Sequence, residues 1–149
     1  MEDDTYIEWR NLIGAFMVRF AEVEFEIARA LIDFSPQNYD DLKYLEFSKR
    51  VNKLRNYISS TKLSNSEKSE LRKILDDLIE LADVRNTIAH NPIRISLESI
   101  FSSTSWDEIR SLRNQESVVT LDVLSNKLSK LTATEERLHE LIGNATFSL

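Results

Sequence analysis

Apolar residues recur in alternating steps of four and three through the first quarter of the chain, which is a seven-residue repeat. This spacing keeps one face of a long helix apolar and directs it toward partner helices. A second apolar row widens the face enough to contact more than one neighbour. The repeat consists of Trp9, Ile13, Phe16, Phe20, Val23, Ile27, Ala30 and Phe34. We expect one long helix here that ends at Ser35-Pro36, because a residue before proline avoids the helical region.

Three further segments show the same helical spacing. One begins near residues 38–41 and carries the stripe Tyr44, Phe47, Val51, Leu54 and Ile58. The next follows a Ser64–Glu67 capping box, ends near His90 before Asn91-Pro92, and carries Leu71, Leu75, Leu78, Ala82 and Ala89. The last opens near Thr120, stops at Gly143-Asn144, and carries Leu121, Leu124, Leu128, Leu131, Leu138 and Ile142. Each pattern predicts an amphipathic helix.

The stretch between the last two helices is less regular. Residues 93–97 and 117–121 alternate like short strands that could pair as an antiparallel ribbon. Between them, Ser105 and Glu108 have capping-box spacing, which predicts a short helix through about Arg113. The predicted fold is therefore all-α: one domain over residues 1–149, an up-and-down four-helix bundle with a short irregular or β-ribbon insertion before the last helix.

Composition narrows the classes of function. Two glycines and two prolines among 149 residues are too few for a β-sandwich or a glycine-dependent nucleotide fold. With no cysteine and two histidines, we expect no disulfide, no metal site and no cofactor. The acidic start lacks a signal-peptide pattern, and no apolar run reaches membrane-spanning length, so we expect a cytoplasmic protein.

The charge is unevenly distributed along the chain. The net charge is −6, yet residues 43–73 contain nine basic and three acidic residues. This block is either a solvated face that balances acidic neighbours or a track for an RNA backbone. If it is a track, we expect Lys49, Arg50 and Lys53 to contact RNA, together with Arg94 downstream.

The segment that can carry chemistry lies at the end of the third predicted helix. Asn86 and His90 are one turn apart, and the negative end of the helix dipole stabilises a protonated His90. Arg85 lies in the packing register, so its guanidinium must reach a carboxylate, a cleft or a subunit interface. A forked guanidinium suits a phosphate, and a histidine can transfer a proton. Alternatively, Arg85 pairs with Glu24 or Glu22 and His90 simply ends the helix.

Arg85-Asn86-Thr87-Ile88-Ala89-His90 resembles the Arg-x4–6-His motif of HEPN domains, including the Asn that often follows the arginine. The resemblance implies a metal-independent endoribonuclease that acts as a dimer, with Arg85 and His90 catalytic and Asn86 orienting or contacting RNA. It also implies a role in defence or toxin–antitoxin systems and, as a further partner, an antitoxin or defence protein. The subgroup regulated by nucleotide transfer carries a Tyr two residues after the histidine, where this chain has Pro92.

Two other classes of function remain open. A HEPN-like module could bind RNA, a nucleotide or a protein without cutting it, or the chain could be a helical bundle whose first helix mediates oligomerisation. For two other residues the sequence supports only a less specific interpretation. His139 lies among surface charges and is expected to be exposed. Trp106 either stacks on a base or anchors the insertion.

Overall fold

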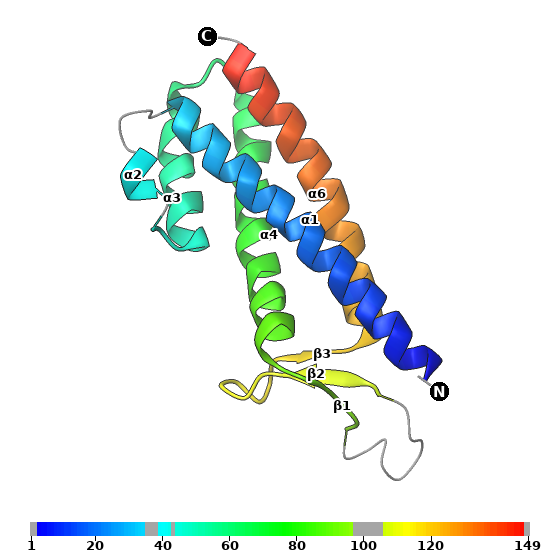
Figure 1. The fold of residues 1–149 in the computed structure, drawn as a ribbon. Helices are drawn as coiled ribbons and strands as arrows, with labels where there is room; N and C mark the ends of the chain where they lie inside the picture. Colours follow the sequence, from blue (N-terminus) through cyan, green and yellow to red (C-terminus); the bar gives the residue numbers. More distant parts are fainter. Residues whose placement is uncertain (1–2, 35–38, 43, 97–105, 148–149) are drawn as a thin grey trace.

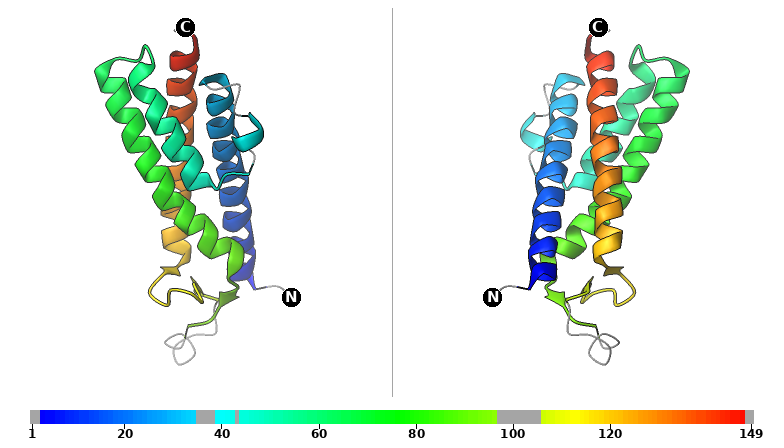
Figure 2. Two further views of the ribbon diagram at one scale, coloured as in Figure 1. Left: turned by 90° about the vertical axis from the view of Figure 1, so that its left-hand side faces the viewer. Right: turned by 90° about the vertical axis from the view of Figure 1, so that its right-hand side faces the viewer.

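The computed structural model describes residues 3–34, 39–42, 44–96 and 106–147, and these residues are mainly helical. The long helices are α1 (Asp4–Phe34), α4 (Asn65–His90) and α6 (Leu121–Phe147). The shorter ones are α2 (Tyr39–Leu42), α3 (Phe47–Tyr57) and the 3-10 turn η2 (Ile58–Ser60). Figure 1 shows α1 running beside α6, and Figure 2 shows α3 against the first half of α4.

The apolar repeat of α1 forms the centre of the core. Trp9, Phe16 and Phe20 are almost fully buried, as are Val23 and Ile27. The helix packs most extensively along α6 and also contacts α3 and α4. The wide apolar face predicted for this segment therefore does contact several neighbours, and α1 ends at Phe34, directly before the Ser35-Pro36 that lies outside the described residues.

The ends of α4 follow the sequence signals closely. Ser64 Oγ accepts a hydrogen bond from Glu67 N, and Ser64 N donates to Glu67 Oε2 at 2.8 Å, so the capping box is confirmed. These two contacts satisfy amides that have no partner inside the helix. The backbone leaves the helical region at Asn91. His90 is therefore the last residue of α4.

A three-stranded antiparallel sheet lies between α4 and α6, at one end of the molecule (Figure 1). It consists of β1 (Ile93–Arg94), β2 (Glu108–Arg110) and β3 (Val118–Val119) in the order β1-β2-β3. Ile93, Ile109 and Val119 are paired across the strands and pack toward the core. Because side chains alternate along a strand, Arg94, Glu108 and Arg110 lie on the other face.

Four local predictions were wrong. The segment predicted to start near residues 38–41 forms two helices with a break between them, and Tyr44 in that break is 82% exposed. Residues 108–110 form β2 rather than a helix continuing to Arg113, so β1 and β3 pair with β2 and not with each other. The stripe on α4 buries Ile88 instead of Ala89. The helix α6 continues through Gly143, whose φ is not positive, so no left-handed stop forms there.

Candidate functional site

His90 lies at the end of α4, where its side chain is exposed to solvent. The next residue, Asn91, has extended backbone angles and is followed by Pro92, which ends the helix. Asn91 Nδ2 donates a hydrogen bond to the carbonyl of Thr87 at 2.8 Å and satisfies one of the last carbonyls of the helix. Within the described residues, no hydrogen bond or ion pair engages the ring of His90.

A cleft of about 350 Å³ opens beside His90. One wall comes from the last two turns of α4 and the other from the connection between β2 and β3. The residues that line it are Asn86, Thr87, His90, Asn91, Ser111, Leu112 and Arg113. The structure therefore brings together two of the three residues predicted to be catalytic, Asn86 and His90.

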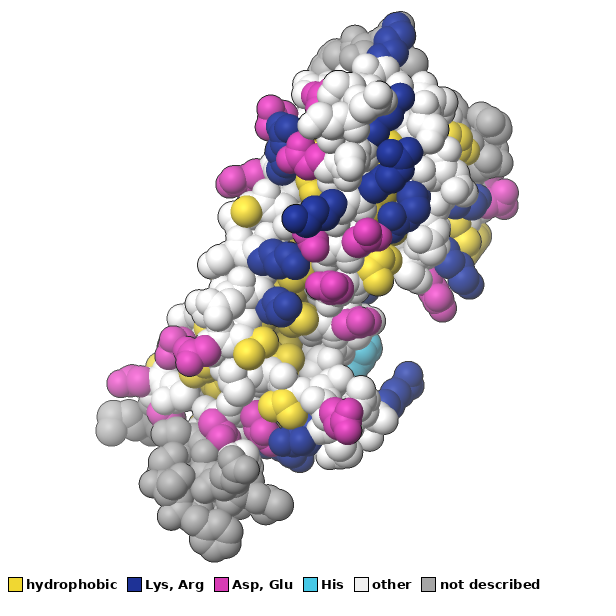
Figure 3. Space-filling view, turned by 180° about the vertical axis from the view of Figure 1, so that it is seen from behind, with side chains coloured by type: hydrophobic (Ala, Val, Ile, Leu, Met, Phe, Trp, Pro, Cys, Tyr) yellow, Lys and Arg dark blue, Asp and Glu magenta, His cyan; other side chains and the backbone are white. Residues whose placement is uncertain are grey.

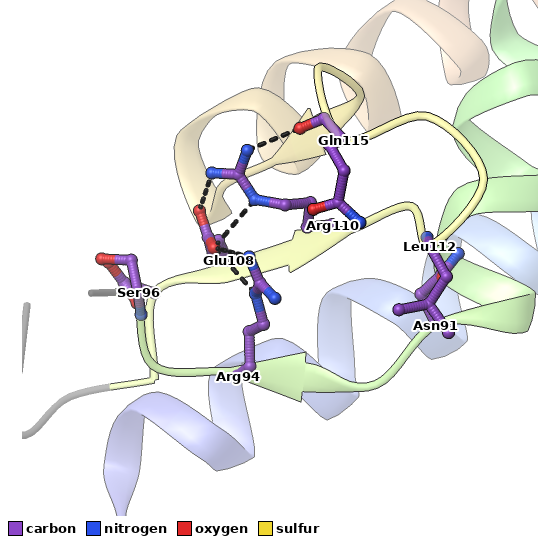
Figure 4. Close-up of polar contacts among 8 residues, drawn as sticks. Asn91, Arg94, Ser96, Glu108, Arg110, Leu112 and Gln115 are labelled. Atoms are coloured by element: carbon purple, nitrogen blue, oxygen red, sulfur yellow. Dashed lines mark hydrogen bonds and ion pairs between the residues drawn. The ribbon is translucent and has the colours of Figure 1, made fainter. Parts of the chain in front are cut away.

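The β2–β3 connection is held in place by side-chain hydrogen bonds to its backbone. Leu112 N donates to Asn91 Oδ1 at 3.0 Å, and Figure 4 shows these two residues next to each other. Arg113 N and Asn114 N both donate to Ser111 Oγ, at 3.3 and 3.2 Å. This wall of the cleft is thus held to the end of α4 through Asn91 and is braced internally by Ser111.

Arg85 lies outside this cleft. Its Nη1 is 3.0 Å from Glu24 Oε1 on α1, and its guanidinium carbon is 4.9 Å from the centre of the Phe20 ring. The packing register predicted that this arginine would need a partner, and Glu24 is one of the two carboxylates expected. Through this ion pair Arg85 joins α4 to α1, and its side chain is only 23% exposed.

The exposed edge of Arg85 faces a second cavity, of about 430 Å³. Its lining includes two carboxylates, Glu46 and Asp83, and shares Asn86 with the His90 cleft. Arg85 and His90 thus stand in neighbouring cavities on either side of Asn86. The environment of Arg85 is acidic, whereas none of the described residues that line the His90 cleft is acidic.

The residues predicted to bind RNA are separate from the cleft. Lys49, Arg50 and Lys53 lie on α3, and Lys49 is 4.0 Å from Glu46 in an exposed ion pair. None of the three lines the His90 cleft. Figure 3 shows Lys and Arg side chains gathered mainly on the upper half of the face opposite to that of Figure 1, whereas the sheet lies at the lower end.

Arg94, the fourth predicted RNA contact, is held by Glu108 on the outer face of the sheet. Arg94 Nε and Arg110 Nη2 approach the Glu108 carboxylate at 2.8 and 3.1 Å, and Figure 4 shows the carboxylate between the two guanidinium groups. Burial alone would raise the pKa of Glu108, but the hydrogen bonds from Arg110 and Arg94 outweigh it and lower the pKa below its ordinary value. Arg94 is therefore engaged in an ion pair within the chain.

Two secondary predictions have clear outcomes. His139 is exposed as expected, but its Nδ1 is also 2.9 Å from Glu26 Oε1, a contact that the sequence did not predict. Glu26 is buried between the apolar positions Val23 and Ile27 of α1. Trp106 anchors the insertion, because its carbonyl accepts a hydrogen bond from Trp9 Nε1 at 3.0 Å and its ring packs against the core.

Sequence reasoning missed five of the residues that line the cleft: Thr87, Asn91, Ser111, Leu112 and Arg113. Asn91 is half-buried and makes hydrogen bonds to both walls, and Ser111 and Arg113 stand in the connection that was predicted to be the end of a helix. The polar run Arg113–Ser117 is a signal that could have identified a turn here. The side chain of Asn91 carries no comparable signal, because its two partners are far apart in the chain.

Comparison with protein-family models, with curated proteins and with solved structures finds no significant match. Among the described residues, no helix has both the length and the apolar character needed to cross a bilayer. No cluster of acidic and histidine side chains in the described part of the chain is suited to hold a metal ion. The chain's own residues are therefore the basis for assigning a function.

Proposed function

We propose that this protein is a metal-independent endoribonuclease of the HEPN type. The observation that carries the proposal is the open cleft at the end of α4, where Asn86 and His90 of the Arg-x4–6-His motif face solvent together. The long helices α1, α4 and α6 with the shorter α3 fit an up-and-down four-helix bundle, and the small sheet occupies the place of the insertion before the last helix.

The proposed reaction is attack of a ribose 2′ oxygen on the adjacent phosphorus. A base takes the 2′ proton, the bond from 2′ oxygen to phosphorus forms, and the bond from phosphorus to the 5′ oxygen breaks. An acid protonates the leaving 5′ oxygen, so the products carry a 2′,3′-cyclic phosphate and a 5′ hydroxyl. His90 supplies the proton transfer, and Asn86, one turn earlier on α4, orients or contacts the RNA.

A homodimer supplies what one chain lacks. One imidazole cannot serve as base and acid in the same event, and the cleft contains one histidine. Two clefts facing each other would provide both groups. The motif role of Arg85, stabilising the charge on the pentacoordinate phosphorus, requires its guanidinium to exchange Glu24 for a phosphate oxygen.

The cellular setting belongs to the same proposal. HEPN ribonucleases act in cytoplasmic defence and in toxin–antitoxin pairs, so we expect an RNA substrate and a neutralising or triggering protein partner. Lys49, Arg50 and Lys53 on α3 would guide the RNA backbone, and their removal would flatten the salt dependence of RNA binding. No cofactor or metal takes part in the proposed reaction.

The test is cleavage of structured RNA by purified protein in EDTA. We expect cutting with cyclic phosphate ends, loss of at least about a hundredfold in rate with His90→Ala, and no cutting where the 2′ hydroxyl is replaced by hydrogen. His139→Ala is the matched control, since His139 is the only other histidine and lies against Glu26, outside the cleft. Cleavage by His90→Ala at the wild-type rate would disprove the assignment.

A second function is favoured by one contact. The Arg85–Glu24 ion pair gives the motif arginine a role inside the chain, as expected for a HEPN-like module that binds RNA, a nucleotide or a protein and does not cut. RNA binding that is weakened by changes in the His90 cleft, with no cleavage under any condition tested, would establish this function instead.

A further inference from the structure

We infer that Arg113, on the β2–β3 connection, binds a phosphate of the RNA in the His90 cleft, and that Leu112 beside it contacts an unpaired base. This inference rests on the proposed function for its choice of ligand. It assigns the phosphate to a residue outside the Arg-x4–6-His motif, in place of Arg85.

The first support is the difference between the two cavities. Arg113 is exposed and lines the same cleft as His90, and no residue in the described part of the chain forms an ion pair with its guanidinium. Arg85 is held by Glu24 and faces a cavity lined by Glu46 and Asp83. A phosphate at Arg85 would therefore have to displace one carboxylate and approach two others, whereas at Arg113 it meets a cation in a cleft without acidic lining.

The second support is the way the connection is held. Asn91 accepts from Leu112 N while donating to the Thr87 carbonyl, and Ser111 Oγ accepts from two successive amides. These bonds fix the backbone of residues 111–114 against the end of α4 before any ligand arrives. A preorganised backbone reduces the ordering cost of binding, so the side chain of Arg113 is the main part left to be ordered.

The third support is the character of Leu112. This side chain lines the cleft beside Arg113 and is 72% exposed, so its apolar surface is open to a ligand in the cleft. An apolar surface next to a cation matches a nucleotide, which offers an apolar base face and an anionic phosphate. Bases in a duplex hide their faces, so the cleft favours single-stranded RNA.

Binding of an oligoribonucleotide methylated at every 2′ oxygen tests the inference, because this probe cannot be cut. Arg113→Ala should weaken binding of the single-stranded probe by about tenfold and reduce the slope of log affinity against log salt by about 0.7. Arg113→Lys should retain most of the affinity, since it keeps the charge. Leu112→Ala should weaken binding to the single strand and leave binding to the matching duplex unchanged.

Two control variants separate the cleft from general charge. Lys127→Ala removes one partly exposed positive charge on α6, outside the basic block of residues 43–73, and Glu116→Gln changes an exposed charge in the same β2–β3 connection. Both should change the affinity by less than about twofold to threefold. Circular dichroism and the Tm of each variant confirm that the fold is retained.

The outcomes distinguish this inference from the proposed ribonuclease activity. If His90→Ala abolishes cleavage while Arg113→Ala binds and cuts like wild type with the same salt slope, the inference is overturned and the activity stands. If the wild type does not cut but Arg113→Ala still loses affinity and salt slope, the phosphate site stands and the activity fails. A loss equal to that of Lys127→Ala would show nonspecific attraction and would also overturn the inference.

Discussion

Arg85 on α4 and Glu24 on α1 form an ion pair, with Nη1 3.0 Å from Oε1, directly above the ring of Phe20. The pair joins the helix that carries the motif to the helix that forms the centre of the core. Both side chains are partly shielded, at 23% and 32% exposed, so water screens the pair less than a surface contact. The motif arginine therefore links α4 to α1, whatever it does in the reaction.

A double-mutant cycle should show this coupling. Arg85→Met and Glu24→Gln, alone and together, are expected to give a coupling free energy of about 1 kcal/mol in urea unfolding. The Arg55–Asp76 pair is a suitable control, because Asp76 is 66% exposed and that pair should couple by less. Equal coupling free energies in both pairs would show that the position of Arg85 beside the core does not strengthen its ion pair with Glu24.

Asn91 should control the order of the cleft wall. In Asn91→Ala the Leu112 amide loses its acceptor, and we expect its hydrogen exchange to become about tenfold faster. Asn91→Asp keeps an acceptor for Leu112 and loses the donor to Thr87, so it should retain most of the protection. Unchanged exchange at Leu112 in the alanine variant would mean that other contacts hold the wall.

Stability should fall in acid partly through Glu108. Its pKa is lower in the folded protein than the ordinary value of 4.5, so the unfolded chain binds the proton more readily. The stabilisation is complete above about pH 4.5 and is lost as the pH falls through the folded pKa. Glu108→Gln should flatten this part of the Tm profile, whereas Glu116→Gln should not. An equally steep acid limb in Glu108→Gln would contradict the prediction.

Gly143→Ala should stabilise the protein. Gly143 lies inside α6 with no positive φ, and a Cβ added there would meet no atom within 4 Å. Alanine reduces the entropy of the unfolded chain and is expected to raise the free energy of unfolding by about 0.5–1 kcal/mol. Gly14→Ala, in an equally open position on α1, should behave in the same way. A lower Tm in both variants would indicate a contact that only glycine permits.

Periodicity and capping signals predicted the long helices well. The apolar repeat of α1 follows from helical spacing within one segment, the capping box at Ser64 joins residues three apart, and the structure has both. The prediction of one continuous second helix was wrong because Tyr44 is a large apolar residue at the right spacing, yet it lies exposed between α2 and α3. The predicted helix end at Gly143 was wrong because glycine permits a left-handed helix stop but does not force one.

The site was only partly predictable, for a physical reason. The spacing of Asn86 and His90 follows from the geometry of one helix, and the need of Arg85 for a partner follows from its packing register. The opposite wall depends on β2, which pairs with β1 on one side and with β3 on the other, and whose Glu108 matches a helical capping pattern equally well. Pairing between strands, rather than the preference of each residue for helix or strand, decides where Arg113 lies.

The cleft at His90 has one wall made from a long helix and another made from a short connection between two-residue and three-residue strands. The helical wall belongs to α4, which packs against α1, α3 and α6, whereas the connection reaches the rest of the protein mainly through Asn91 and its own backbone. Residues 111–117 can therefore change in length or in charge while His90 stays in place. Under the proposed function, RNA preference should diversify in that connection faster than the motif residues change on α4.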